Sequence, residues 1–561
     1  MNSPNLIEPI SSDINYFIEL FILIESVKQP IFPKDLKNKI EKFLNIIKTK
    51  NESIQKETIY FLTKSLSESI YIESSLIFRY LLKNAFNIDY SGVPDHKIAT
   101  SDLDDRKEDK EYDIFTNESE SIDDITEILN NIGKENKLKP FGNFFSEYTN
   151  KYEYDNDLAL KICKKCMKRD HYFSKAKSEI LVFPEYLTML DDLYQCVFFN
   201  FYKYEYNPYD IFYDLNQKCY IAILASCSIG CDYLTKELIS IFLLNGGEKD
   251  WLENGIESSE KFKSIAKLCN VLANKPFDLN YKAINELDLD IDNFSKLCLF
   301  ISVVQKFATI LTILNIKFNT KKELEQIKQE RILKKDEKKL EIDLKLFYEW
   351  VLDKKSNSNY RREKEKQKKW LKKLKDDNQI DYDIKKNSPY KKFISSEVPC
   401  YENFSHHFYY YLNQYDYDFQ TVSYYLIKEY WPELLKIIKE DCSFIERFTS
   451  NNFGIHDPIE NTDSYRECIV TYVEILYGMI DDCHNYEQNN KLLTIYMKYF
   501  IKNIVCFPKN VEFPKIDKKD FDYMDLLHII LLSTQTKLKV QLCYVAKAIK
   551  EYDDYKNNIC E

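Results

Sequence analysis

Apolar residues recur at intervals of three and four along much of this chain, the period of an amphipathic α-helix. The clearest run spans Cys219 to Gly247 and ends in two glycines, Gly246 and Gly247. A helix C-terminus often needs a residue that tolerates positive φ, so the helix is expected to stop there. The pattern predicts one long helix whose buried stripe contains Tyr220, Leu224, Cys227, Cys231, Leu234, Leu238 and Ile241.

Similar spacing predicts further helices over residues 183–201, 262–273, 294–314, 465–480, 499–506 and 526–552. Only 9 glycines and 15 prolines interrupt 561 residues, which favours an all-α fold of two or more domains. We expect five segments: an N-terminal helical extension (1–94), an acidic flexible insert (95–139), a first domain (140–318), a charged helical linker (319–400) and a last domain (401–561).

The charged segments differ in sign. Residues 95–127 are acidic and polar with few apolar anchors, which is typical of a flexible insert. In the linker, opposite charges alternate up to about residue 350, as on a solvated helix. The remainder is mostly basic and includes Tyr360 and Trp370. A phosphate-binding role is the alternative there, but scattered lysines are no specific signature, so a plain linker helix is favoured.

Composition narrows the class of protein. The chain has a net charge of −11, which argues against a surface built for nucleic acid. Its first residues lack the basic start and apolar run of a secretion signal. Fifteen cysteines without such a signal indicate a reducing cytoplasmic or nuclear location. The apolar run 17–24 contains Glu19 and is too short for a membrane span, so no membrane span is expected.

Two groups of cysteines are candidates for chemistry. Cys163 and Cys166, with His171 nearby, resemble half of a zinc site, but no second pair follows at suitable spacing, so no metal is expected. Cys231 has two interpretations. A buried free cysteine usually serves as a small hydrophobe, whereas a redox thiol needs a base or cation that stabilises the thiolate. Position in the sequence does not decide between them.

Three stretches together resemble the sestrins: Phe183–Leu187 (FPEYL), Cys231–Gly255 (CDYLTKELISIFLLNGGEKDWLENG) and Leu268–Leu279 (LCNVLANKPFDL). The resemblance covers roughly residues 140–315 and 406–555. It implies an all-α protein of two AhpD-like helical domains, after the alkyl hydroperoxidase AhpD, joined by the charged linker. It also implies a stress- and nutrient-responsive regulator of TOR signalling.

An AhpD-like alkyl hydroperoxide reductase is the alternative function. The resemblance implies that Cys231 and Tyr233 would be its catalytic residues. The family's histidine, seven residues after the cysteine, is replaced by Leu238, which can neither donate nor accept a proton. Cys227 and Cys231 are four residues apart rather than in a CxxC pair. Peroxidase activity is therefore expected to be weak or absent, and no cofactor is expected.

The resemblance further implies a site for a free amino acid such as leucine. Arg466 takes the place of the family's carboxylate-binding arginine, and Asp525 that of its ammonium-binding glutamate. The family's lid tryptophan is missing, and Lys518 lies near its place. The alternative for Arg466 and Asp525 is an ordinary surface pairing of unlike charges or two solvated side chains. The complete set of expected ligand-binding residues is Thr449, Asn452, Thr462, Arg466, Asp525 and His528.

A pair of aspartates in the family contacts the GATOR complex that controls TOR signalling. Asp481 and Asp482 lie in the corresponding region, with the pair shifted by one position. The resemblance thus implies a GATOR-type partner. A solvated helix end is the alternative interpretation of these two residues.

Overall fold

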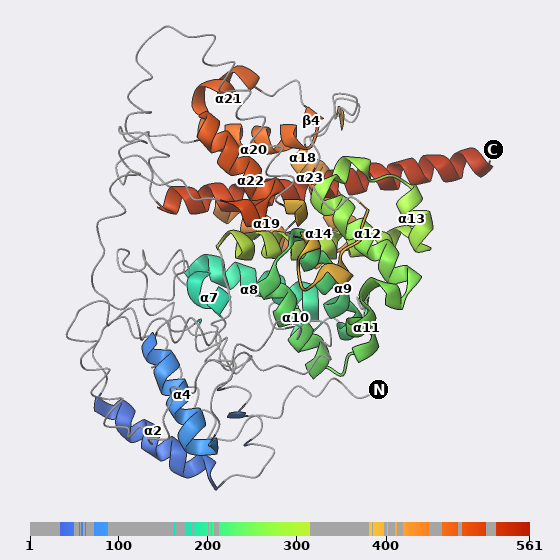
Figure 1. Cartoon of the computed structure of the whole chain (residues 1–561). Coiled ribbons are helices and arrows are strands. Elements are labelled where there is room, and N and C mark those ends of the chain that lie inside the picture. Colours follow the sequence, from blue (N-terminus) through green and yellow to red (C-terminus); the bar gives the residue numbers. More distant parts are fainter. Residues whose placement is uncertain are drawn as a thin grey trace.

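The computed structural model describes residues 213–314, 385–397, 419–447, 463–480, 485–511 and 523–560. It also describes 34–49, 72–87, 175–180, 184–199 and 381–383, with pairs and single residues elsewhere. This part of the chain is helical (Figure 1), which confirms the predicted all-α class. Its strands are pairs of residues: β1 (Phe201–Tyr202) with β2 (Glu205–Tyr206), antiparallel, and β3 (Tyr410–Tyr411) with β4 (Met479–Ile480), parallel. The two AhpD-like domains and all domain boundaries stay predictions.

One apolar helix, α14 (Ile291–Ile313), lies at the centre of the described helices. It begins at Asp290, whose carboxylate accepts from the backbone N–H of Asn293 at 2.7 Å. On one side α14 packs against α9 (Leu215–Ile229), which also contacts α12 (Glu260–Asn274) and α10 (Asp232–Leu244). On the other side it packs against α23 (Tyr523–Cys560). Helices from the first and last predicted domains therefore pack against the same central helix.

The C-terminal helices surround α23, the longest helix of the described part at 38 residues. It contacts α18 (Phe419–Tyr430), α19 (Pro432–Arg447), α20 (Asp463–Leu476) and α22 (Ile495–Cys506). The C-terminal end of α23 projects beyond the other helices (Figure 1). Other elements are α8 (Pro184–Phe199), α7 (Lys175–Ile180), α11 (Lys249–Asn254), η2 (Gly255–Ser258), η3 (Pro276–Asp278), α13 (Lys282–Leu287), α21 (Tyr486–Leu492) and η8 (Pro508–Asn510).

The predicted single helix from Cys219 to Gly247 is wrong. Gly230, with φ 84°, ends α9 in the left-handed conformation, and its N–H donates to the carbonyl groups of Cys227 and Ser226. Cys231 is the N-cap of α10. The expected stop is confirmed, because α10 ends at Leu244 and Gly246 has φ 77°. The predicted helix 465–480 is also too long, since α20 ends at Leu476 and β4 follows.

Buried polar side chains join α14 to helices on both sides. The Gln305 amide donates to the Ser228 hydroxyl at 2.9 Å and accepts from the Gln541 amide of α23 at 2.8 Å. The next residue, Lys306, bonds the Asp441 carboxylate of α19 and the Gln535 side chain of α23. Buried hydrogen bonds of this kind have strict geometry, so they fix how the helices align.

Part of the predicted linker packs on the N-terminal helices. Residues 385–397, here called the strap, contain the short helix η6 (Lys391–Phe393), which contacts α9 and η2. Phe393 is 2% exposed. The acidic insert 95–139 and the linker residues 319–380 lie outside the described residues. Toward the N-terminus, α2 (Lys34–Ile47) and α4 (Ile72–Phe86) pack against each other within the predicted extension.

Among the described helices, α14 alone is long and apolar enough to cross a membrane. This is weak support for a span, because the core helix of a globular protein passes the same test. In the structure, 83% of its most apolar window is buried against other helices.

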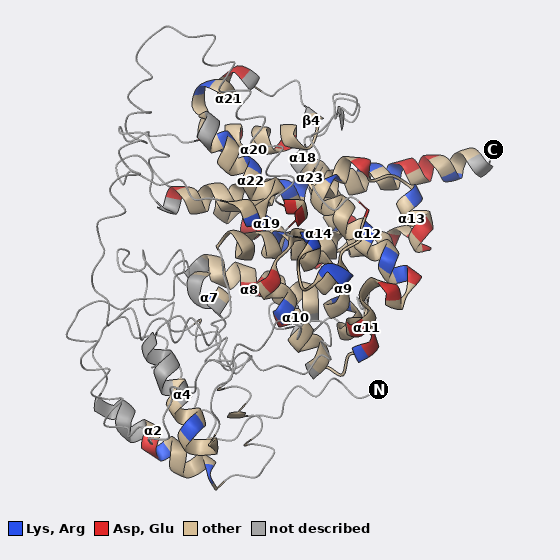
Figure 2. Cartoon of the chain, viewed as in Figure 1, with Lys and Arg blue, Asp and Glu red and all other residues tan. Residues whose placement is uncertain are grey.

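Figure 2 shows both charge signs on the outer elements α11, α13 and the projecting end of α23.

Candidate functional site

The junction of α9 and α10 holds the two candidate cysteines. Cys227 lies in the last turn of α9, and Cys231 begins α10, where its carbonyl accepts from the Thr235 N–H at 3.0 Å. Both side chains are buried, at 2% exposure. The predicted burial of Cys231 is confirmed, although the residue lies at a helix start rather than in the middle of a helix.

Hydroxyl groups surround the Cys227 thiol. Thr235 Oγ1 lies 3.5 Å from Cys227 Sγ and 2.8 Å from Ser226 Oγ. Burial raises the pKa of Cys227 to about 12, and hydrogen bonding with Thr235 only partly offsets this. Burial likewise raises the pKa of Cys231 to about 11, against the lowering effect of a hydrogen bond with Thr312. Both thiols are therefore protonated at neutral pH.

One cation lies near the thiols. Lys509 Nζ is 3.2 Å from both carboxylate oxygens of Asp232, the residue after Cys231. Its charge lowers the pKa of both cysteines, but this effect is smaller than that of burial. Leu238, at the family's histidine position, is 0% exposed. The geometry is that of a packed core rather than an open thiolate site, and the catalytic roles of Cys231 and Tyr233 stay predictions.

The candidate amino-acid site combines α20 with α23, two helices in contact. Asp525 and His528, one turn apart on α23, are both 0% exposed. Arg466 is on α20, and its guanidinium pairs with the Asp463 carboxylate in the first turn of that helix. The predicted helix 465–480 correctly contains Arg466, whereas Asp525 lies one residue before the predicted helix 526–552 and is in the first turn of α23. The roles of both residues stay predictions.

His528 is a buried imidazole on α23. Burial lowers the pKa of His528 to about 4; a hydrogen bond from Nε2 to the Ile445 carbonyl at 2.8 Å opposes the shift, and the charge of Arg466 adds to it. The imidazole is thus neutral at physiological pH. Asp525 and His528 lie one turn apart on α23, and α23 contacts α20, which carries Arg466.

Five predicted site residues lie outside the described residues: Thr449, Asn452, Thr462, Asp481 and Asp482. The same holds for Cys163, Cys166 and His171 of the discounted zinc site. Within the described chain, no group of three or more His, Cys, Asp or Glu side chains is arranged to hold a metal ion.

Sequence reasoning missed the buried ion pair of Lys306 with Asp441, each 1% exposed at its side chain. One signal was present, since Gln305 and Lys306 are adjacent polar residues inside the largely apolar stretch 297–313 of this helix. A lysine there requires a partner, because an unpaired buried charge is costly. Nothing in the sequence identifies that partner as Asp441.

Comparisons of the sequence with known proteins point to one family. A family model described as PA26 p53-induced protein (sestrin) matches residues 209–339 and 312–553. Similar curated proteins include Sestrin-1 of Xenopus laevis, 26% identical over 139 residues, or 24% of this chain and 29% of that protein. The Sestrin homolog of Dictyostelium discoideum is 24% identical over 171 residues, 30% of this chain and 28% of the homolog.

Sestrin-2 of Homo sapiens is 25% identical over 139 residues, covering 24% of this chain and 29% of its own length. These alignments each span less than a third of the relative. The family model, in contrast, extends over more than half of the 561 residues, from α9 to α23. On that match, the chain belongs to the sestrin family.

Proposed function

We propose that this protein is a stress- and nutrient-responsive regulator of the sestrin type. It restrains TOR signalling in the cytoplasm by binding a GATOR-type partner complex, and a free amino acid such as leucine controls that binding. The observation that supports the proposal is the contact of α20, which carries Arg466, with α23, which carries the buried Asp525 and His528.

The chemistry of this region suits an amino acid. A guanidinium binds a carboxylate through two parallel hydrogen bonds, and a carboxylate binds an ammonium group. Arg466 and Asp525 supply these two groups, and the buried apolar residues Leu526 and Ile529 directly follow Asp525 and His528 in the sequence. The Arg466 guanidinium already pairs with the Asp463 carboxylate, whose side chain is 59% exposed. The carboxylate of an incoming amino acid would have to displace Asp463 or bind beside it.

A reductase function receives less support from the thiol site. Nucleophilic attack on a peroxide requires a thiolate, and burial raises the pKa of both Cys227 and Cys231. Leu238 offers no proton relay. We therefore propose that the thiols serve packing and that regulation by binding is the main activity.

Isothermal titration of the full-length protein with leucine, and with a panel of other amino acids, tests the ligand site. We expect a binding heat that the Arg466→Ala variant loses, with affinity falling at least about tenfold because a charge-assisted pair is removed. Lys491→Ala is the matched control, since Lys491 pairs with Glu487 on exposed α21. Equal heats for Arg466→Ala and wild type would refute the site.

A pull-down with purified GATOR-type complex tests the partner. We expect capture by wild type, loss of capture with Asp481→Ala/Asp482→Ala, and weaker capture when the amino acid identified by titration is added. Equal capture by wild type, by the double variant and in the presence of the amino acid would contradict both the aspartate contact and regulation by the amino acid.

A further inference from the structure

A groove of about 120 Å³ lies between α12 and α13. Part of its lining is apolar and buried, because Leu268, Leu279 and Leu287 are 3%, 2% and 6% exposed. Val271 and Ala283 complete the apolar part of the lining. An apolar side chain of another molecule would therefore leave water when it enters this groove.

The volume of the groove matches one side chain. Pockets for cofactors and drug-sized ligands usually measure about 300–1,000 Å³. An apolar cavity of roughly 150 Å³, in contrast, holds a single benzene molecule. At about 120 Å³ the groove is too small for a cofactor and fits the end of one aliphatic side chain.

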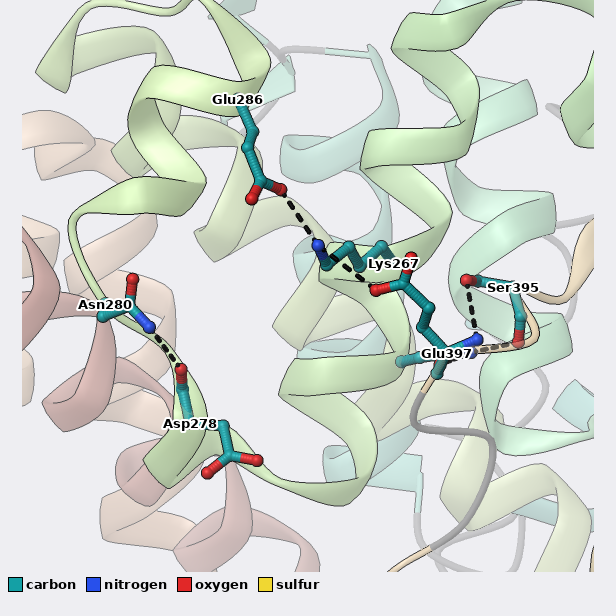
Figure 3. A network of polar contacts seen from close by, with 7 residues as sticks. Lys267, Asp278, Asn280, Glu286, Ser395 and Glu397 are labelled. Carbon is teal, nitrogen blue, oxygen red and sulfur yellow. Dashed lines mark hydrogen bonds and ion pairs between the residues drawn. The ribbon is translucent and has the colours of Figure 1, made fainter.

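Charged side chains form the rim of the groove. Lys267 Nζ of α12 lies 3.2 Å from Glu286 of α13 and 3.2 Å from Glu397 of the strap (Figure 3). These three side chains are 37%, 48% and 60% exposed, so all of them are accessible to another molecule. A buried apolar centre inside an accessible polar rim is the usual anatomy of a protein–protein interface.

Negative charge exceeds positive charge at this rim. Asp278 and Lys282 also line the groove, so the rim has three carboxylates and two ammonium groups. Residues 278–292, which contain α13, include five acidic residues and one basic residue. A cation from a partner can pair with Glu286 while Lys267 keeps Glu397, so neither existing charge is left unpaired.

Hydrogen bonds hold the walls of the groove in place. The Asn280 side chain donates to the Asp278 carbonyl at 3.0 Å (Figure 3) and accepts from the Lys282 N–H at 3.0 Å. On the other side, Asn270, 1% exposed, donates to the Glu397 carbonyl at 2.9 Å. The groove is thus formed before a partner binds, which lowers the entropic cost of binding.

A tyrosine pair extends this surface from the groove to α23. Tyr281 directly follows the groove residue Asn280 and stacks on Tyr555 in the projecting end of α23, with 4.7 Å between ring centroids (Figure 1). Tyr555 is 40% exposed. Tyrosine is enriched at interfaces, because its ring is apolar and its hydroxyl can still form hydrogen bonds. The groove, its rim and this pair are together called the α13 surface.

We propose that the α13 surface docks a partner protein that carries an aliphatic side chain next to an arginine or lysine. The aliphatic side chain fills the groove, the cation pairs with Glu286, and Tyr555 packs on the partner at the edge of the contact. This docking does not depend on the amino-acid site, because Asp525 and Tyr555 are about 45 Å apart along the axis of α23.

Selection of peptides on the full-length protein tests the docking. A phage-displayed library of random peptides of about 12 residues is selected on wild type, and enriched peptides are synthesised and titrated by fluorescence anisotropy. We expect peptides with Leu, Ile, Val or Met within about four positions of Arg or Lys, because one anchor and one charge are what the surface recognises.

Two variants change the groove and its rim separately. Ala283→Leu fills the groove and should weaken binding of the selected peptides at least about tenfold. Glu286→Gln should weaken binding about two- to fivefold at low salt and less at high salt, because the rim is exposed. Glu487→Gln is the matched control, since Glu487 pairs with Lys491 on exposed α21, and it should bind as wild type does.

Tyr555→Ala tests the edge of the surface. It should weaken binding of the same peptides about threefold or more, because it removes an exposed aromatic contact. Tyr425→Ala is the matched control, since Tyr425 is 56% exposed on α18, and it should have no effect. All of these variants should keep the wild-type unfolding temperature within a few degrees and the wild-type heat of leucine titration, which separates this proposal from the amino-acid site.

Three outcomes would overturn the proposal. The first is a selection that yields no peptides with an aliphatic residue near a basic one. The second is equal affinity of such peptides for wild type, Ala283→Leu and Glu286→Gln. The third is a wild-type dimer, measured by light scattering, that Ala283→Leu dissociates, because the surface would then bind a second copy of this chain.

Discussion

Lys306 and Asp441 form an ion pair in the interior of the protein, with each side chain 1% exposed. The pair joins α14 to α19, and Gln535 of α23 bonds the same lysine. Three helices from distant parts of the chain therefore meet at one charge. An ion pair at this depth fixes the arrangement of the helices more than it stabilises them, because desolvation offsets much of the attraction.

Lys306→Met should destabilise the protein by about 3–5 kcal/mol, because it leaves the Asp441 carboxylate buried without its cation. Lys306→Met/Asp441→Leu should recover much of that loss. Urea unfolding followed by circular dichroism measures both. Lys296→Met on the same helix is the control, since its pair with the largely exposed Asp292 contributes about 1 kcal/mol or less. Equal losses for Lys306→Met and Lys296→Met would contradict the role of the pair.

Cys231 should react slowly with alkylating reagents in the native protein. With a pKa of about 11, its thiolate fraction at pH 7.5 is lower than that of a free cysteine by on the order of 100-fold or more. Its alkylation rate should climb about tenfold per pH unit up to pH 10 without a plateau. Turnover of an organic hydroperoxide should be the same for wild type and Cys231→Ser. Turnover that depends on Cys231 would show that the thiol is activated.

His528 should make stability depend on pH. Its folded pKa of about 4 lies below the unfolded value near 6.5, so the native state favours the neutral ring. The neutral ring therefore contributes roughly 3 kcal/mol to the free energy of unfolding above pH 6.5, and this contribution is lost as the pH falls toward 4. Unfolding free energies measured from pH 8 to pH 4 for wild type and His528→Asn should diverge over this window. Parallel curves would show that the histidine does not titrate there.

Gly255→Ala should be far more harmful than Gly246→Ala. Both glycines have positive φ, 60° and 77°, so each alanine carries backbone strain of roughly 1–2 kcal/mol. Only the Cβ atom at position 255 would meet a backbone atom, the Lys392 carbonyl oxygen, while position 246 has nothing within 4 Å. We expect a loss of at least about 3 kcal/mol for Gly255→Ala in thermal or urea unfolding. Similar losses would argue against close contact of the strap with η2.

Helix identity could be predicted wherever an apolar stripe continues over several turns. The stripes correctly predicted α8, α12, α14 and the long α23. The break at Gly230 was missed because the stripe from Cys227 to Leu234 continues across it, and a glycine inside a helix costs only about 1 kcal/mol. Whether such a glycine stays helical depends on what packs around it, here the Lys509 side chain.

Some properties of the candidate sites could also be predicted from the sequence, whereas others depend on tertiary packing. Burial of Cys231 follows from its place on an apolar stripe. The raised pKa values of the thiols, in contrast, require knowledge of what covers them. The packing of the strap on α9 and η2 gives no signal in the sequence either, because residues around it are charged and Asn270, which bonds its backbone, lies 125 residues away from Ser395.

The sequence by itself determined the all-α class, the positions of several long helices and the family of the chain, because helix periodicity and motif spacing are local properties. Only the tertiary structure decided which polar groups are buried together, such as Lys306 with Asp441 and Asn270 with the strap. These pairings join residues more than 100 positions apart, and their energy depends on desolvation that exists only once the helices have packed.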